Sequence, residues 1–172
     1  EDRKDAVAVC ARLGIPLYLR NFADAYWDQV FEHFIAEYRR GRTPNPDVLC
    51  NREIKFKTFL DHARALGARK IATGHYARVD CVDGRWRLLR ARDADKDQTY
   101  FLFAMKQEQL ARTVFPVGGL EKPQVRELAA RFKLSVAEKK ESQEICFIPD
   151  NDYVRFLEAS GVAASPGDIV DS

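Results

Sequence analysis

The sequence lacks the features that would place it in a membrane or in an oxidising compartment. Its apolar runs fall far short of the roughly 20 residues that a membrane-spanning helix needs. The charged opening Glu1–Asp5 leads into no apolar segment of the secretory kind. The four cysteines, at positions 10, 50, 81 and 146, form neither a CxxC pair nor a disulfide framework. These absences favour a cytoplasmic protein with no membrane partner.

Other absences narrow the function. The net charge of +2 is too small to predict nucleic-acid binding by itself, and we find no internal repeat or low-complexity tract. No metal site is predicted, because His33 and His62 fall within helical patterns that offer no companion ligands. What remains is a chain of 172 residues, 46% hydrophobic and 31% charged. That length and composition are typical of one globular domain, either an enzyme or a binding domain.

Alternating helical and strand patterns predict an α/β fold. Apolar residues recur at helical spacing over 6–13, 27–38 and 56–63, whereas Ile15–Leu19 and Lys70–Thr73 have the pattern of short strands. Such an alternation is typical of a mostly parallel sheet with helices on its faces. The remaining predicted elements are a hairpin over 76–80 and 85–90 around Asp83-Gly84, and helices near 97–105 and 123–132.

The arrangement of these elements predicts the domain organisation. The first helix has no strand before it, and a sheet that lacked its first strand would leave apolar helix faces uncovered. We therefore expect the chain to be an interior piece of a longer protein. One domain is predicted over 1–163, incomplete at its N-terminus, and residues 164–172 are expected to form a linker or the start of a following β-rich domain.

The loop Pro44-Asn45-Pro46-Asp47 is the first candidate for chemistry. Each proline fixes its own φ and restricts the residue before it, so the loop is expected to be rigid. Asp47 is placed to cap the helix that follows, and Cys50 is expected on the first turn of that helix. The exposed N–H groups of a helix start can lower a thiol pKa. The competing interpretation is a capped helix that carries a structural cysteine.

The other candidates are less specific by themselves. Cys146 lies in the apolar run 144–148 and is expected in the core, and Lys139-Lys140 could hold its thiolate only if they are spatial neighbours. Gly74 and His75 follow a predicted strand, at the edge where α/β sheets bind ligands. His75 is then a base, an RNA contact or a polar loop residue. The remaining interpretations are a phosphate contact or a solvated helix start for Lys96-Asp97-Gln98, packing for Cys10 and a surface position for Cys81.

Taken together, five segments resemble the bacterial tRNA-specific 2-thiouridylases (tRNA-uridine 2-sulfurtransferases). The similarity covers nearly the whole chain, and the order and spacing of the motifs are specific. The PNPDxxC loop followed by the later Cys of ICF is more diagnostic than any single motif. The matching segments are GRTPNPDVLCNREIKFKTFL (41–60), ATGHYAR (72–78), DADKDQTYFL (93–102), FPVGGLEKPQVRELA (115–129) and ESQEICFIP (141–149).

The resemblance implies both a fold and an activity. The fold would be adenine-nucleotide alpha-hydrolase-like (PP-loop, Rossmann-like), a parallel sheet with helices on both faces, a small β-hairpin and a helical extension. Enzymes of this family adenylate C2 of the wobble uridine with ATP, which Mg²⁺ would accompany, and replace its oxygen with sulfur from a cysteine persulfide. The implied partners are tRNA and either a persulfide-donating sulfur carrier or a cysteine desulfurase.

The resemblance also assigns roles to individual residues. Cys50 and Cys146 match the two catalytic cysteines. The segment that holds the target base is matched by Asn45, Pro46 and Asp47, and Asp47 is the expected acid/base. Gly74 matches a glycine of the ATP site. The tRNA-contacting positions are matched by His75, Lys96, Asp97 and Gln98.

The sequence departs from the family at two places. It contains neither the SGGxDS-type pyrophosphatase loop nor the C-terminal β-barrel region, so we expect this chain alone to be nearly inactive in the ATP-dependent step. Two alternatives of another class stay open. One is a nucleotide-binding relative that adenylates a small carboxylate or carbonyl, which would not explain the paired cysteines. The other is a non-catalytic RNA-binding or thiol-redox module.

Overall fold

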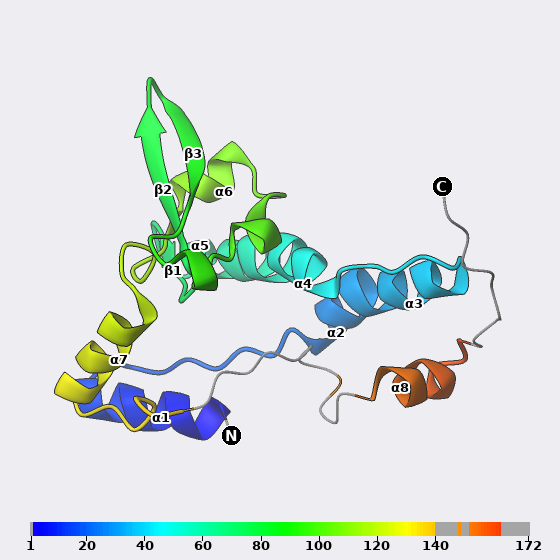
Figure 1. Cartoon of the computed structure of the whole chain (residues 1–172), viewed down its shortest axis with the longest axis horizontal. Helices are drawn as coiled ribbons and strands as arrows, with labels where there is room; N and C mark the ends of the chain where they lie inside the picture. The colour runs from blue at the N-terminus through cyan, green and yellow to red at the C-terminus, as the bar shows by residue number, and fades with distance from the viewer. Residues whose placement is uncertain (1, 140–147, 149–151, 163–172) are drawn as a thin grey trace.

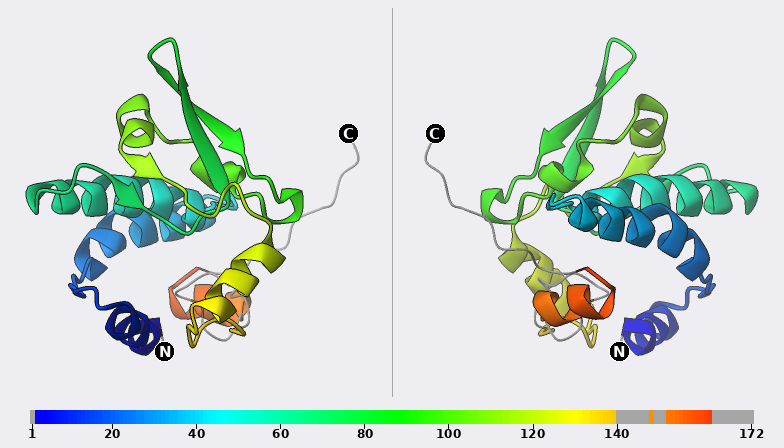
Figure 2. Two further views of the ribbon diagram at one scale, coloured as in Figure 1. Left: turned by 90° about the vertical axis from the view of Figure 1, so that its left-hand side faces the viewer. Right: turned by 90° about the vertical axis from the view of Figure 1, so that its right-hand side faces the viewer.

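The computed structural model describes residues 2–139, 148 and 152–162. Helices and two small sheets are combined in these ranges, which confirms the α/β mixture (Figure 1). Both figures place the β-hairpin on the side of the molecule away from helices α1, α7 and α8 (Figures 1 and 2). The predicted linker at 164–172 lies outside the described residues.

Helix α1 spans Asp2–Leu13, and the helix predicted over 6–13 is confirmed. The predicted strand at Ile15–Leu19 is wrong. That segment is an exposed connection without secondary structure, in which Tyr18 is 81% exposed and Leu19 is 59% exposed. A strand forms only where a neighbouring backbone accepts and donates its hydrogen bonds, and no described strand lies beside this segment. The apolar pattern of Ile15–Leu19 was therefore not sufficient to predict a strand.

Two long helical runs follow. The first consists of α2 (Ala23–Tyr26), the π-helical turn η1 (Trp27–Phe31) and α3 (Glu32–Arg39). The second consists of α4 (Pro46–Leu49), the π-helical segment η2 (Cys50–Phe59) and α5 (Leu60–Ala65). Dihedral angles at the junctions remain helical, so each run is continuous (Figure 1). The two predicted helices are therefore confirmed, and we call the second run the 46–65 helix.

The parallel sheet in the described residues is small. Strand β1 (Ile71–Ala72) pairs with β4 (Thr113–Val114), with Ile71 opposite Thr113. The strand predicted at 70–73 is thus confirmed at its centre. The wider parallel sheet with helices on both faces that the sequence predicts is not seen in these ranges, because β1 and β4 form a sheet of two strands.

The predicted hairpin is confirmed. Strands β2 (Ala77–Val82) and β3 (Arg85–Arg90) are antiparallel, and Asp83 and Gly84 connect them. Both connecting residues have positive φ, +49° and +76°. A turn of this kind has the twist that a two-residue hairpin needs, which explains why an Asp-Gly pair occupies it.

The remaining elements are short. The helix predicted near 97–105 is wrong as a continuous helix, because that range holds a single turn of 3₁₀-helix at 99–102. Asp97 and Gln98 separate it from another such turn at 94–96. The helix predicted over 123–132 is confirmed. The elements are η3 (Ala94–Lys96), η4 (Thr99–Leu102), α6 (Gln107–Ala111), α7 (Lys122–Arg131) and α8 (Tyr153–Ala159).

The main core lies where the 46–65 helix covers the small sheets. Phe56 and Leu60 from this helix pack with Ile71 of β1, Ala77 of β2 and Leu102 of η4, all less than 6% exposed. A second cluster joins Val30 to Leu49 and Ile54. Within the described ranges, no helix is long and apolar enough to cross a membrane.

The start of the 46–65 helix is capped by Asn45 and not, as the sequence predicts, by Asp47. The Asn45 Oδ1 accepts hydrogen bonds from the backbone N–H groups of Asp47 and Val48, both at 3.1 Å. Pro46 occupies the first helical position, where its missing N–H costs nothing. The capping residue therefore lies two residues earlier in the sequence than predicted, and the Asp47 carboxylate is not needed for the cap.

Replacing Asn45 by Ala should lower the free energy of unfolding by about 1 kcal/mol, because two backbone N–H groups lose their acceptor. Asn45→Ser should retain most of the stability, since a hydroxyl can accept the same bonds. Asp47→Asn should cost less than about 0.5 kcal/mol through the helix dipole alone. Urea unfolding of the three variants tests this. A larger loss for Asp47→Asn than for Asn45→Ala would return the cap to Asp47.

Candidate functional site

Asp47 lies in the first turn of the 46–65 helix, and it is the backbone N–H of Asp47 that takes part in the cap. The residue is exposed as a whole, yet the surrounding protein takes part of the water from its carboxyl group. This desolvation raises the pKa of Asp47 above its ordinary value, and the nearby Lys55 ammonium opposes the rise. A carboxyl group whose pKa moves toward neutrality is better suited to exchange protons.

Cys50 lies in the second turn of the helix rather than the first. Because the helix begins at Pro46, Cys50 is its fifth residue, and its own N–H group already bonds to the preceding turn. The effect of the helix start on its thiol is therefore weaker than the sequence predicts, since the dipole effect fades after one turn. The half-buried Cys50 packs against the cluster of Val30, Leu49 and Ile54.

The segment 96–101 is tied to the same helix. The Asn51 side chain is 4% exposed, and its Nδ2 donates to the Phe101 carbonyl at 3.1 Å. Its Oδ1 is buried and has no protein partner. This bond reaches from the residue after Cys50 to the turn that follows Gln98. It brings two of the predicted motifs, PNPDxxC and DKDQ, against each other.

Asp97 and Gln98 serve the fold first. Asp97 accepts hydrogen bonds from the Ala91 N–H at 2.7 Å and from the Thr99 hydroxyl at 2.6 Å. Burial would raise the pKa of Asp97, but these bonds and Arg90 hold it below its ordinary value. Gln98 pairs with Tyr76, because its Oε1 accepts from the Tyr76 N–H and its own N–H donates to the Tyr76 carbonyl, both at 2.9 Å.

Gly74 and His75 lie just after β1, at the carboxyl end of the small parallel sheet. Gly74 is exposed, and a Cβ built on it would meet no atom within 4 Å. His75 is half-buried against the rings of Phe56 and Phe115, and its Nδ1 lies 2.9 Å from the Thr73 hydroxyl. Burial lowers the pKa of His75 to about 4, and Lys55 adds to the effect. His75 is therefore uncharged at neutral pH.

The structure thus joins three of the predicted segments, the helix start at 45–50, the loop at 74–76 and the segment 96–98. Lys96 is half-buried in η3. Cys146 lies outside the described residues, so its distance from Cys50 stays a prediction. As expected, Cys81 is exposed, while Cys10 is only half-buried on α1.

Lys55 is a member of this region that the sequence analysis missed. Its charge influences the pKa of both Asp47 and His75, so its ammonium group lies within electrostatic reach of both. The π-helical hydrogen bonds of η2 place residues five apart on successive turns, which brings Lys55 one turn beyond Cys50. On a helical wheel with 3.6 residues per turn, by contrast, positions 50 and 55 fall on different faces of the helix. The only signal in the sequence was one of the two lysines in REIKFK (52–57).

Comparisons with known proteins define the class of this chain. Residues 1–150 match the family model described as the tRNA methyl transferase HUP domain, and the chain belongs to that family. Among curated relatives, it is 58% identical over 171 residues to the tRNA-specific 2-thiouridylase MnmA of Xylella fastidiosa strain 9a5c. It is 59% identical over 169 residues to the protein of the same name from Pseudomonas paraeruginosa.

These alignments cover nearly all of this chain and less than half of each relative. The shares are 99% of this chain and 45% of the Xylella protein, and 98% and 45% for the Pseudomonas protein. A third relative, the tRNA-specific 2-thiouridylase MnmA of Nitrosococcus oceani, is 57% identical over 98% of this chain and 46% of its own length. The family resemblance inferred from the motifs is thereby confirmed.

The depressed pKa of His75 has a consequence for stability. As the pH falls below 6.5, an ordinary histidine in the unfolded chain takes up a proton, whereas folded His75 does so only near 4. Protonation therefore stabilises the unfolded state relative to the folded state, and the free energy of unfolding falls as the pH drops from 6.5 to about 4. Between pH 7 and pH 5, the free energy of unfolding of the unchanged protein should fall by up to about 2 kcal/mol more than that of the His75→Gln variant. Urea unfolding at both pH values measures this, and equal losses would contradict the burial of an uncharged ring.

Proposed function

We propose that the protein carrying this chain is an ATP-dependent tRNA-uridine 2-sulfurtransferase that converts the wobble uridine to 2-thiouridine. The observation that carries the proposal is identity of 57–59% over nearly the whole chain to relatives named tRNA-specific 2-thiouridylases. The geometry supports it, because the motifs that the resemblance assigns to base, nucleotide and tRNA are packed together. In this proposal the protein works in the cytoplasm.

The loop Asn45–Asp47 would hold the target uridine. Asn45 and Pro46 give the loop its shape through the helix cap and the fixed proline ring. Asp47 is then available to hydrogen-bond the base at N3, where a proton must leave and return as the carbonyl becomes a thiocarbonyl. Its raised pKa supports this acid/base role.

ATP is the proposed co-substrate, and the surroundings of Gly74 fit a nucleotide. The backbone at Gly74 is open on the side where a Cβ would stand, and it lies beyond the carboxyl end of β1. A nucleotide could therefore approach the main chain closely there. Mg²⁺ would accompany the phosphates; within the described ranges, no group of His, Cys, Asp or Glu gathers to hold a metal ion.

The sulfur chemistry is assigned to Cys146 and Cys50. The uridine O2 attacks the α-phosphate of ATP, and pyrophosphate leaves. The terminal sulfur of a Cys146 persulfide then attacks C2, and AMP leaves with the former carbonyl oxygen. Finally the Cys50 thiolate attacks the Cys146 sulfur, which releases 2-thiouridine and forms a Cys50–Cys146 disulfide. The two electrons that reduce the transferred sulfur come from these thiols. An external thiol reductant must then reduce this disulfide to two thiols, after which a persulfide-carrying protein or a cysteine desulfurase would reload Cys146.

The tRNA contacts divide into two kinds. Lys96 supplies a cation of the type that binds phosphate. Asp97, Gln98 and His75 offer no positive charge, and the hydrogen bonds of Asp97 and Gln98 are used to tie 91, 76 and 99 together. We infer that these three shape the RNA-facing loop and touch the tRNA through neutral or backbone groups.

The alternative is a non-catalytic RNA-binding or thiol-redox module. Thiol trapping by alkylation, followed by peptide mass spectrometry with and without tRNA, separates the sulfurtransferase from a thiol-redox module. A sulfurtransferase should show protection of Cys50 by tRNA that carries the target uridine. A plain redox module should react equally in both cases.

Asp47→Asn in the intact protein should retain tRNA binding and lose thiolation by about 10²- to 10⁴-fold, because the proton transfer loses its base. Asn45 remains as the helix cap, so the fold should persist. Single-turnover thiolation and tRNA binding, measured together, test the prediction. Full activity in the folded variant would remove Asp47 from the chemistry.

The two cysteines should fail at different steps. Cys146→Ser should abolish persulfide loading, whereas Cys50→Ser should load sulfur and then stall before 2-thiouridine is released. Their Cα atoms must come within about 7 Å of each other in at least one state to close the disulfide. Mass spectrometry of the loaded variants locates the persulfide, and Cys81→Ser serves as a matched control. A persulfide on Cys50, with Cys146→Ser still active, would reverse the assignment.

A further inference from the structure

Two aromatic rings stand exposed on one short turn beside the candidate site. Tyr100 is 65% exposed and Phe103 is 67% exposed, and their ring centroids are 6.4 Å apart. Tyr100 belongs to η4, and Phe103 is the C-cap residue that follows it. Single exposed apolar residues are ordinary on a protein surface, but a pair of large rings on four consecutive residues is a local concentration.

The backbone beneath these rings is held firmly. Leu102, which lies between them in sequence, is 1% exposed and belongs to the main core. The Phe101 carbonyl accepts the Asn51 hydrogen bond at 3.1 Å, and the Phe101 N–H donates to the Gln98 carbonyl at 3.0 Å. The rings are thus exposed because the turn points them outward, and the turn itself is anchored on both sides.

The ring of Tyr100 is also supported by its neighbours. The Phe101 ring meets it edge to face, with centroids 5.3 Å apart and planes at 86°. The Phe103 ring lies tilted against it at 53°. A ring that other rings hold in place loses little side-chain freedom when a flat ligand stacks on it.

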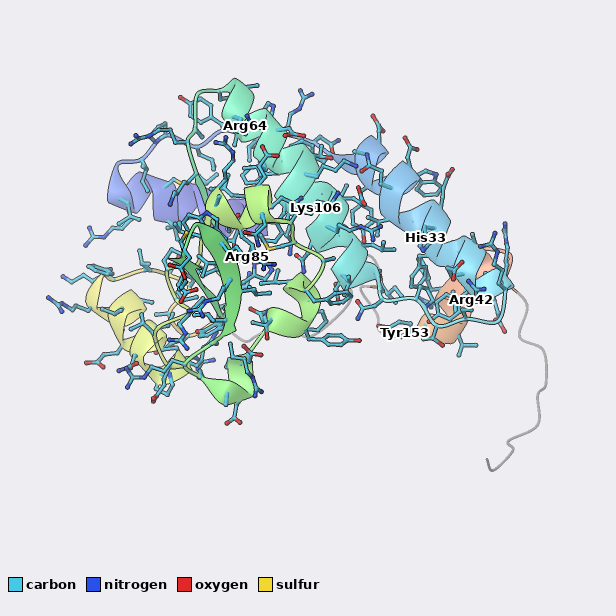
Figure 3. All side chains as sticks on the ribbon, turned by 90° about the horizontal axis from the view of Figure 1, so that it is seen from above. His33, Arg42, Arg64, Arg85, Lys106 and Tyr153 are labelled. Atoms are coloured by element: carbon cyan, nitrogen blue, oxygen red, sulfur yellow. The ribbon has the colours of Figure 1, made fainter. Side chains whose placement is uncertain are left out.

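The position of the turn indicates what kind of ligand would stack there. It follows directly after Lys96-Asp97-Gln98, the predicted tRNA contacts, and Asn51 ties it to the helix that begins with the predicted base-holding loop. A groove directly after Phe103 is lined by Ala104 and by four basic and three acidic side chains. Of its cations, Arg64 belongs to α5 and Lys106 caps the start of α6; both are labelled in Figure 3. Three of these cations already pair with acidic residues of the groove, Arg52 and Lys57 with Glu53 and Arg64 with Glu108. Exposed aromatic faces beside the predicted tRNA contacts suit a single strand, whose unpaired bases stack on them.

We propose that Tyr100 and Phe103 form a stacking platform for an unpaired RNA base that neighbours the target uridine. The inference rests on the proposed function and adds to it the residues that hold the loop of the RNA open. Stacking on an aromatic ring is sequence-tolerant, because every base has a flat π face. The platform would therefore favour unpaired over paired RNA, without selecting one base.

The test compares leucine variants of the intact protein in binding to a labelled anticodon stem–loop RNA. Tyr100→Leu and Phe103→Leu should each weaken binding by about 5- to 100-fold. Tyr100→Phe should bind as the unchanged protein does, because the ring is kept. Phe132→Leu removes another exposed aromatic residue, 54% exposed at the end of α7, and should have no effect.

Two further measurements identify stacking as the cause. Binding of a fully paired duplex should be unchanged in all variants, since its bases are not available. The dependence of binding on salt concentration should also keep its slope, because no phosphate contact is removed. If both leucine variants bind the stem–loop as tightly as the unchanged protein does, the platform is overturned.

The outcomes also separate this inference from the proposed function. If both leucine variants bind and thiolate tRNA normally, the platform is wrong and the sulfurtransferase assignment stands. If the unchanged intact protein neither binds nor thiolates tRNA, the proposed function itself fails. Should a leucine variant lose its fold, ultraviolet crosslinking of the unchanged protein to a 5-bromouridine-labelled loop replaces it. Crosslinks on the 99–103 peptide support the platform, and crosslinks confined to other peptides overturn it. Variants that alter association with another protein and leave RNA binding intact would also overturn it.

Discussion

The side chain of Phe56 connects the parts of the site to one another. It is fully buried in the 46–65 helix and packs in one cluster with Ile71 of β1, Leu102 of η4 and Phe115 after β4. Its ring also lies 5.7 Å from that of His75. The loop after β1 and the turn with the exposed rings are thus both positioned against one core on the 46–65 helix, whereas the helix start packs in the cluster of Val30, Leu49 and Ile54. Removing so large a buried side chain as Phe56 would leave a cavity beside the loop and the turn.

The elements that the sequence predicted correctly are those with strong local causes. The Asp-Gly pair favours a tight hairpin turn, and the apolar faces of the predicted helices pack into the hydrophobic clusters. The predicted strand at Ile15–Leu19 and the helix near 97–105 failed for the opposite reason. Whether an apolar segment becomes a strand depends on a partner that a local pattern does not show. The residues between η3 and η4 are held by side-chain bonds, from Asp97 to Ala91 and from Gln98 to Tyr76, which lies 22 residues away.

The candidate site was predictable as motifs and not as an arrangement. PNPDxxC, GHY and KDQ could each be found in the sequence, yet nothing local indicated that Asn51 would bond to Phe101. The capping residue was misassigned because Asn45 and Asp47 are both good caps, and only the bonds distinguish them. Lys55 was missed because π-helical spacing changes which residues share a face. A helical wheel of the usual period hides that relation.

The paired hydrogen bonds between Gln98 and Tyr76 join the loop of Gly74 to the segment of Lys96. Two segments fixed to each other in this way cannot shift independently. If one holds nucleotide and the other holds RNA, as proposed, then occupancy of either site biases the geometry of the other. Coupling of this kind is reciprocal by thermodynamic necessity, so an RNA that tightens the nucleotide site is itself held more tightly once the nucleotide is bound.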